Sequence, residues 1–317
     1  MLGERFLRAY AAGGNVRFLQ DALVSLRAVK QEDPNFDNAR FCIGVTYGQL
    51  RQEQEALEIL SELRDSVRAR HGSAPFLYRI ELQIAYFNIK LYTDEGFDQA
   101  EALLKKLQDE AVKRSGTEWL SQVKSLQAFL FSVKAGYSSD EAKRPLFANL
   151  AVSISQCLLY EPNSPEVRFE ALNALGIASM RLADQKTRSK NATSDSMYQS
   201  EWAEAERAFQ NALDIVPDSV RVLQNIGTMR TLQAKTTSGE DRDSLLHSAE
   251  ESVKLSLDVN DQDQHPFFQL AEIALESKKP LKALEYVRIG RSRPGAVKPM
   301  EWIRLERSAM QMRPATP

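Results

Sequence analysis

The residue types best suited to chemistry are few in this chain. Its histidines are His71, beside a glycine, His247, in a polar helical stretch, and His265, directly before a proline. None stands with Cys, Asp or Glu partners in a spacing typical of a metal site. Cys42 and Cys157 lie inside helical patterns, so we expect both to be small buried hydrophobic residues. The sequence therefore predicts no metal, no cofactor and no catalytic residue.

Glycine and modification motifs add little to this list. Gly13-Gly14 follows no strand, so it indicates a helix-ending turn and not a phosphate-binding loop. Asn191-Ala-Thr193 matches an N-glycosylation motif, which is short enough to recur by chance. We interpret the chain as a protein that is not an enzyme.

Charge and hydropathy exclude several other classes. The 41 basic and 43 acidic residues give a net charge of −2, which argues against a nucleic-acid footprint or an acidic-membrane footprint. The first residues contain no apolar signal stretch, and no window approaches the ~20 apolar residues of a membrane span. With only two cysteines, these features predict a cytoplasmic protein.

A fixed spacing of small and large apolar residues shows how the chain is organised. Ala205, Phe209, Ala212 and Pro217 follow one another at steps of four, three and five residues. The first two steps place three side chains on one helical face, and the proline ends the helix. The same steps recur in an earlier segment, at Ala22, Leu26, Val29 and Pro34.

A second regularity joins the two helices of each predicted hairpin. A step of twelve residues separates Gly44 from Ala56, and the same step separates Ala271 from Ala283. Small residues at these positions allow paired helices to approach closely, while large residues fill the space between neighbouring hairpins.

These residues resemble the tetratricopeptide repeat family. The resemblance implies an all-α fold, a right-handed superhelical solenoid of about seven helix–turn–helix repeats in a single domain, 1–317. Trp302, Leu305 and Ala309 would form the apolar face of a C-terminal capping helix at 299–312. The predicted repeats span approximately 3–36, 37–70, 75–113, 117–162, 165–217, 220–261 and 264–294.

In proteins similar to this one, the first helix of each repeat lines a concave groove. Carrying those positions over predicts a lining that is apolar toward the N-terminus and polar near the sixth repeat. The predicted lining is Phe41, Val45, Leu82, Ile89, Asn173, Ile177, Arg221, Gln224, Asn225, Thr228, Phe268 and Glu272. The alternative is that the apolar members only pack against neighbouring helices. Arg221 and Asn225 match only in part the lysine-and-asparagine clamp that some relatives use for a C-terminal carboxylate.

The fifth repeat contains a polar insertion, 184–199, that would lie on one rim of the solenoid. Its Lys186, Arg188 and Lys190 stand among hydroxyl residues. We interpret this segment as a solvated flexible loop, with a basic contact or a phosphorylation segment as the alternative.

The resemblance implies an adaptor or scaffold that binds a protein segment or peptide in its groove. The alternative is a sensory or regulatory module that binds a signalling peptide or small ligand, or controls an enzyme on another chain. We interpret the N-terminal end, with Leu2, Phe6 and Leu7, as a frayed or irregular first repeat; the alternative is a region for self-association or docking. Recognition of RNA has the least support, because the predicted first helices lack a regular basic pattern.

Overall fold

The computed structural model describes residues 5, 16–70, 74–114, 116–188, 196–260, 263–293, 297 and 299–312. Throughout these residues the regular structure is helical, without a strand, as predicted. The chain divides into two compact units, Met1–Ile215 (unit 1) and Val216–Pro317 (unit 2). The single domain expected from the sequence stays a prediction, and each unit is described by itself.

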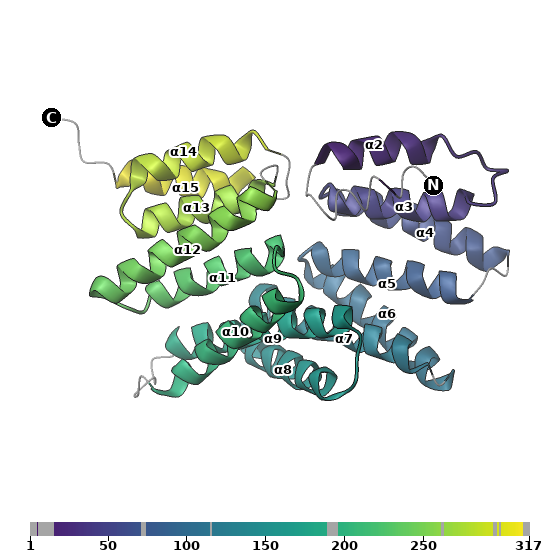
Figure 1. Ribbon diagram of the computed structural model, residues 1–317, viewed down its shortest axis with the longest axis horizontal. Helices are drawn as coiled ribbons and strands as arrows, with labels where there is room; N and C mark the ends of the chain where they lie inside the picture. The colour runs from purple at the N-terminus through teal and green to yellow at the C-terminus, as the bar shows by residue number, and fades with distance from the viewer. Residues whose placement is uncertain are drawn as a thin grey trace. The chain divides into compact units, whose positions relative to one another are not determined.

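The helices of unit 1 follow one another along the chain as antiparallel neighbours (Figure 1). They are α2 (Val16–Arg27), α3 (Phe36–Gln49), α4 (Glu53–Ala69), α5 (Ala74–Lys90), α6 (Asp94–Lys113), α7 (Thr117–Tyr137), a short 3-10 helix η1 (Glu141–Lys143), α8 (Arg144–Tyr160), α9 (Pro165–Arg188) and α10 (Ser196–Ile215). The helices of unit 2 are α11 (Val220–Ala234), α12 (Gly239–Val259), α13 (Gln264–Glu276), α14 (Pro280–Arg291) and α15 (Pro299–Gln311).

Consecutive helices form the hairpins that the repeat spacing predicts. The pairs α3–α4, α5–α6, α7–α8 and α9–α10 match the predicted second to fifth repeats, and α11–α12 and α13–α14 match the sixth and seventh. The first helices also contact one another, α3 with α5, α5 with α7 and α7 with α9 in unit 1, and α11 with α13 in unit 2. Each unit is therefore an all-α solenoid with a continuous layer of first helices.

Small residues stand where the two helices of a hairpin touch. Ala205 and Ala283 are 0% exposed, as predicted. A Cβ atom on Gly44 would lie 2.7 Å from Cγ of Leu60, and one on Gly227 only 2.4 Å from a methyl carbon of Val253. Both distances are too short for real contacts, so the hairpins close only because these positions lack a side chain.

The capping helix also forms as predicted. The side chains of Trp302, Leu305 and Ala309 are buried on α15, and they cover the apolar side of the last hairpin, including Phe267 and Val287. The aromatic ring of Trp302 packs edge-on against the ring of Phe268, with centroids 5.5 Å apart.

Helix boundaries differ from the sequence prediction at the insertions. Helix α9 continues to Arg188, so part of the predicted insertion 184–199 is helical, and α12 already begins at Gly239, inside the polar stretch 236–243 of the sixth repeat. The Arg188 guanidinium contacts the carboxylate of Asp184 at 2.9 Å, one helical turn away, and this type of ion pair supports a solvated helix. One cysteine prediction is wrong, because Cys157 is exposed while Cys42 is buried.

Candidate functional site

The predicted groove residues of unit 1 divide into accessible and buried groups. Val45, Leu82 and Ile177 are half-buried on α3, α5 and α9, so they keep surface that a partner could contact. Ile89 and Asn173 are 0% exposed and lie in the core. The repeat template places these two residues on first helices, but it does not give their depth, so neither one lines an accessible surface.

Phe41 packs mainly against a neighbouring helix, which favours the alternative interpretation over a place in the groove. It is 8% exposed, and its ring lies 6.0 Å from that of Phe76 on α5, centroid to centroid. The Arg79 guanidinium carbon lies 5.0 Å from the Phe41 ring centroid, a cation–π arrangement. Phe41 therefore joins two first helices and offers little surface to a ligand.

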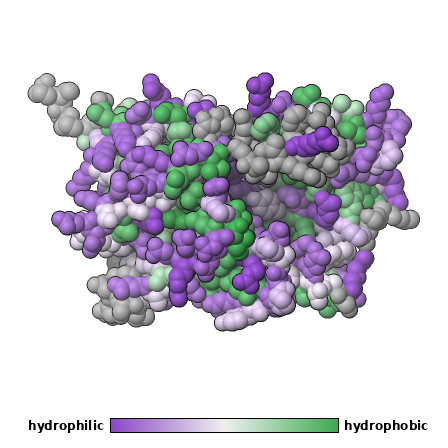
Figure 2. All heavy atoms as spheres, in the orientation of Figure 1, coloured by the Kyte–Doolittle hydropathy of each residue, from purple (hydrophilic) through white to green (hydrophobic). Residues whose placement is uncertain are grey.

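The predicted residues of unit 2 form a row on α11 and α13 that is polar except for Phe268. The side chains of Arg221, Asn225, Thr228, Phe268 and Glu272 are half-buried, and Gln224 is 7% exposed. Hydrophobic residues also gather over α11 and α13 in Figure 2, where much of the surrounding surface is hydrophilic. This part of unit 2 thus combines apolar surface with polar groups of several kinds.

Hydrogen bonds hold this row in place. Nε2 of Gln269 on α13 donates to Oγ1 of Thr228 at 2.7 Å and to the backbone oxygen of Gln224 at 3.0 Å. The Thr228 hydroxyl in turn donates to the same Gln224 oxygen, at 3.1 Å. Because Gln269 is itself buried, these bonds fix the spacing of α11 and α13 at the predicted lining.

Glu272 is the carboxylate of this row, and its surroundings change its pKa. Burial raises the pKa of Glu272 above its ordinary value, although Lys235 and Arg304 favour the charged form. The Arg304 guanidinium lies 3.2 Å from the Glu272 carboxylate and reaches it from α15. A partly desolvated carboxylate in this position is suited to pairing with a further cation.

The residues of the predicted rim insertion are not all in a loop. Lys186 and Arg188 lie in the last turn of α9, where Lys186 contacts the carboxylate of Glu201 on α10. Lys190 lies outside the described residues. The proposed role of these residues in binding stays a prediction.

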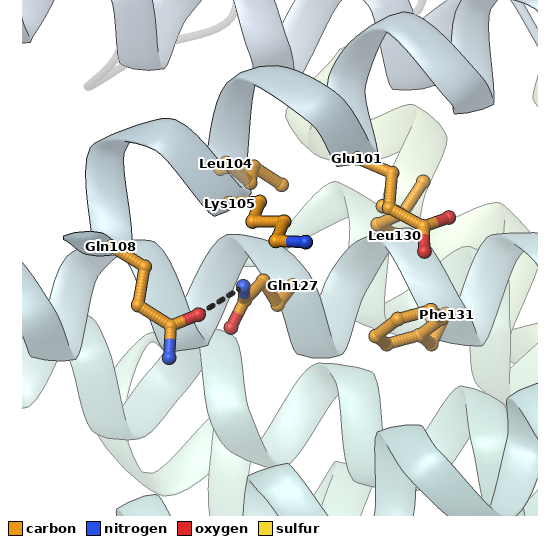
Figure 3. Close-up of a pocket in the computed structure, with 7 residues that line it drawn as sticks. All are labelled: Glu101, Leu104, Lys105, Gln108, Gln127, Leu130 and Phe131. Atoms are coloured by element: carbon orange, nitrogen blue, oxygen red, sulfur yellow. Dashed lines mark hydrogen bonds between the residues drawn. The ribbon is translucent and has the colours of Figure 1, made fainter.

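A pocket of about 280 Å³ lies between α6 and α7, and sequence reasoning missed it (Figure 3). Its lining is Glu101, Leu104, Lys105, Gln108, Gln127, Leu130 and Phe131. Nε2 of Gln127 donates to Oε1 of Gln108 at 2.8 Å, across the two helices. None of the predicted groove residues lines it. Its polar members occupy exposed or half-buried helix positions, for which the repeat spacing predicts no pocket.

Other chemistry finds little support among the described residues. No group of three or more His, Cys, Asp or Glu side chains within them could hold a metal ion. His247 is exposed beside Glu251, and the ring of His265 stacks on Phe268, whereas His71 lies outside the described residues.

A search of the described helices finds none that is both long and apolar enough to cross a membrane. Leu2, Phe6 and Leu7 of the N-terminal end also lie outside the described residues.

No protein-family model matches the sequence, and no sequence relative was found among curated proteins. The structure is similar to the crystal structure of a tetratricopeptide repeat protein from Parabacteroides merdae, with a TM-score of 0.52 at 10% identity over 97% of this chain and 98% of that one. This likeness confirms the predicted tetratricopeptide-type fold.

Two further similarities are more distant. They are human IFIT1 as a dimer with m7Gppp-AAAA (TM-score 0.40, 14% identity, 94% of this chain and 66% of that one) and the TPR2AB-domain:pHSP90 complex of yeast Sti1 (TM-score 0.31, 13% identity, 88% and 100%). Both TM-scores are too low to support a conclusion about this chain.

Proposed function

We propose that this chain is a protein-interaction scaffold whose first helices bind a segment of another protein. The observation that carries the proposal is the row on α11 and α13, where Arg221, Thr228 and Glu272 stand partly exposed on two helices held together by Gln269. Side chains fixed before binding lose less conformational entropy when a partner arrives. A layer of stacked first helices is the surface on which repeat proteins of this kind bind extended segments.

The side chains suggest what the segment carries. In unit 1 the accessible members, Val45, Leu82 and Ile177, are apolar and suit an apolar stretch. In unit 2, Glu272 suits a Lys or Arg side chain, because a cation would stabilise a carboxylate that burial now disfavours. Each unit therefore offers its own surface, with its own preference.

A displayed random-peptide library tests this proposal when it is selected on the immobilised full chain. We expect a selected peptide to bind the Leu82→Glu or Glu272→Gln variant at least ~10-fold more weakly, equivalent to about 1.4 kcal/mol. Leu281→Glu is the matched control, because Leu281 is 64% exposed on the second helix α14. The proposal fails if no peptide is enriched, or if the control weakens binding as much as the first-helix variants.

The pocket between α6 and α7 favours one alternative, a sensory module for a small ligand. Its volume of about 280 Å³ lies just below the ~300–1,000 Å³ typical of ligand sites. A ligand there would raise the melting temperature of the full chain, and Leu130→Ala would reduce that shift. The absence of any shift with a broad metabolite set would argue for the scaffold.

A further inference from the structure

The pocket between α6 and α7 combines buried apolar side chains with exposed polar ones. Leu104 and Leu130 are 0% exposed, and Phe131 is half-buried beside them. The ring of Phe131 is nearly parallel to the ring of Phe147 on α8, with centroids 6.2 Å apart, and this contact holds it in place. A ligand in the pocket would therefore contact two leucine side chains and one phenylalanine ring whose position is already fixed.

The acidic residue of the lining, Glu101, is already paired. Its Oε2 atom lies 2.7 Å from Nζ of Lys134 on α7, and Asp98 is a more distant second partner at 3.8 Å. The Lys134 side chain is only 9% exposed, and its Nζ lies 4.8 Å from the centre of the Phe147 ring. Because a buried ammonium group is costly without an anion beside it, Lys134 holds the Glu101 carboxylate.

This pairing leaves the basic residue of the lining without a carboxylate. Lys105 follows Glu101 by one helical turn, the spacing at which Glu and Lys commonly pair. Among the residues that the structure describes, however, no carboxylate oxygen lies within 4.0 Å of Nζ of Lys105. Figure 3 shows the Lys105 side chain extending from α6 toward α7 across the pocket. The lining thus carries one positive charge that its own acidic residue does not neutralise.

The two glutamines of the lining add hydrogen-bonding groups of both kinds. The bond from Nε2 of Gln127 to Oε1 of Gln108 uses one group of each amide. It leaves Nε2 of Gln108 as a donor and Oε1 of Gln127 as an acceptor at the same end of the pocket. A polar substituent on a ligand could bond to either one.

We propose that the pocket between α6 and α7 binds a small aromatic carboxylate. Its carboxylate pairs with the Lys105 ammonium group, and its ring packs on Phe131, Leu104 and Leu130, since aromatic rings favour offset or edge-on contact with one another. A single lysine matches a single negative charge. The nearby Glu101 carboxylate disfavours a dianion such as a phosphate monoester.

The volume of about 280 Å³ limits the ligand to one ring system with a short side chain. This inference goes beyond the scaffold proposal by giving the pocket a ligand class. Neither depends on the other, because the pocket shares no residue with the predicted groove lining.

Ligand-observed NMR titration of the full chain tests the charge preference. The probes are phenylacetate and indole-3-acetate, with phenylacetamide as the neutral match and acetate as the match without a ring. We expect phenylacetate to bind at least ~5-fold more tightly than phenylacetamide, because a charge-assisted contact is stronger than a neutral one. Acetate should bind more weakly than both. The proposal is overturned if neither aromatic acid binds, or if the acid and its amide bind equally.

Two variants locate the site. Lys105→Met keeps the apolar stem and removes the charge, so it should abolish the preference for the acid over the amide. Lys113→Met is the matched control, because Lys113 is exposed in the last turn of α6 and does not line the pocket. A preference that survives Lys105→Met, or that Lys113→Met abolishes as well, contradicts the site. Peptide selection on the Lys105→Met chain should succeed as it does on the unchanged chain, so a failure of the scaffold proposal is seen separately.

Discussion

At the scale of single residues, the fold depends on small side chains between paired helices. Ala205 is 0% exposed on α10, where α10 packs against α9, so a tryptophan there must push the helices apart. We expect Ala205→Trp to lower the free energy of unfolding by about 1–3 kcal/mol or more. Urea denaturation measures this loss. Ala203→Trp, on the exposed side of the same helix, should cost far less, and equal losses in the two variants would contradict the packing described here.

A second residue-scale prediction concerns the pH dependence of unit 2. Burial alone would raise the pKa of Glu250, but the ammonium groups of Lys254 and Lys282 lower it from 4.5 to about 2. Lys282 lies 2.5 Å from this carboxylate and links α14 to α12. A carboxyl group whose pKa is lower in the folded state stabilises the fold above its unfolded value, and this contribution is lost as the pH falls through the folded value.

The Glu250→Gln variant tests this linkage. At pH 7 it should lose about 1 kcal/mol of unfolding free energy, a modest amount because both lysines are substantially solvated. The difference from the unchanged chain should shrink as the pH falls from 4.5 to about 2. Urea denaturation at several pH values measures it. A difference that stays constant with pH would show that the ion pairs do not stabilise unit 2.

At the scale of helices, sequence spacing predicts most of the architecture. Prolines and small residues mark the ends and contacts of hairpins, so the predicted repeats agree closely with α3 to α14. The polar insertions were predicted less well, because a segment such as 184–188 has a composition that suits a loop and a solvated helix equally. Ion pairs such as the one between Lys186 and Glu201 stabilise the helix here. The repeat pattern does not predict that these two residues lie close together.

The capping helix provides a prediction at the same scale. Trp302 is 2% exposed and attaches α15 to the last hairpin, so its removal leaves a large cavity. We expect Trp302→Ala to reduce the unfolding free energy of unit 2 by about 3 kcal/mol or more. Met300→Ala, at a position 67% exposed on the same helix, should have little effect. Similar losses in both variants would mean that α15 does not cover the core of unit 2.

At the scale of the whole chain, the candidate site was predictable in outline only. The repeat template correctly assigns Leu82 and Thr228 to the layer of first helices. It cannot separate them from Ile89 and Asn173, because depth depends on the neighbouring helices and not on position within a repeat. The pocket lies between α6 of the third repeat and α7 of the fourth, and the repeat template gives its polar lining residues no role.

In the proposed function, the first helices bind the partner and the second helices face away from it. Hydrogen–deuterium exchange of the full chain, with and without a library-selected peptide, distinguishes the two sets of helices. We predict slower exchange in the first helices of at least one unit, among α3, α5, α7 and α9 or in α11 and α13, with the second helices unchanged. Protection confined to the second helices, such as α4, α6 and α12, would contradict it.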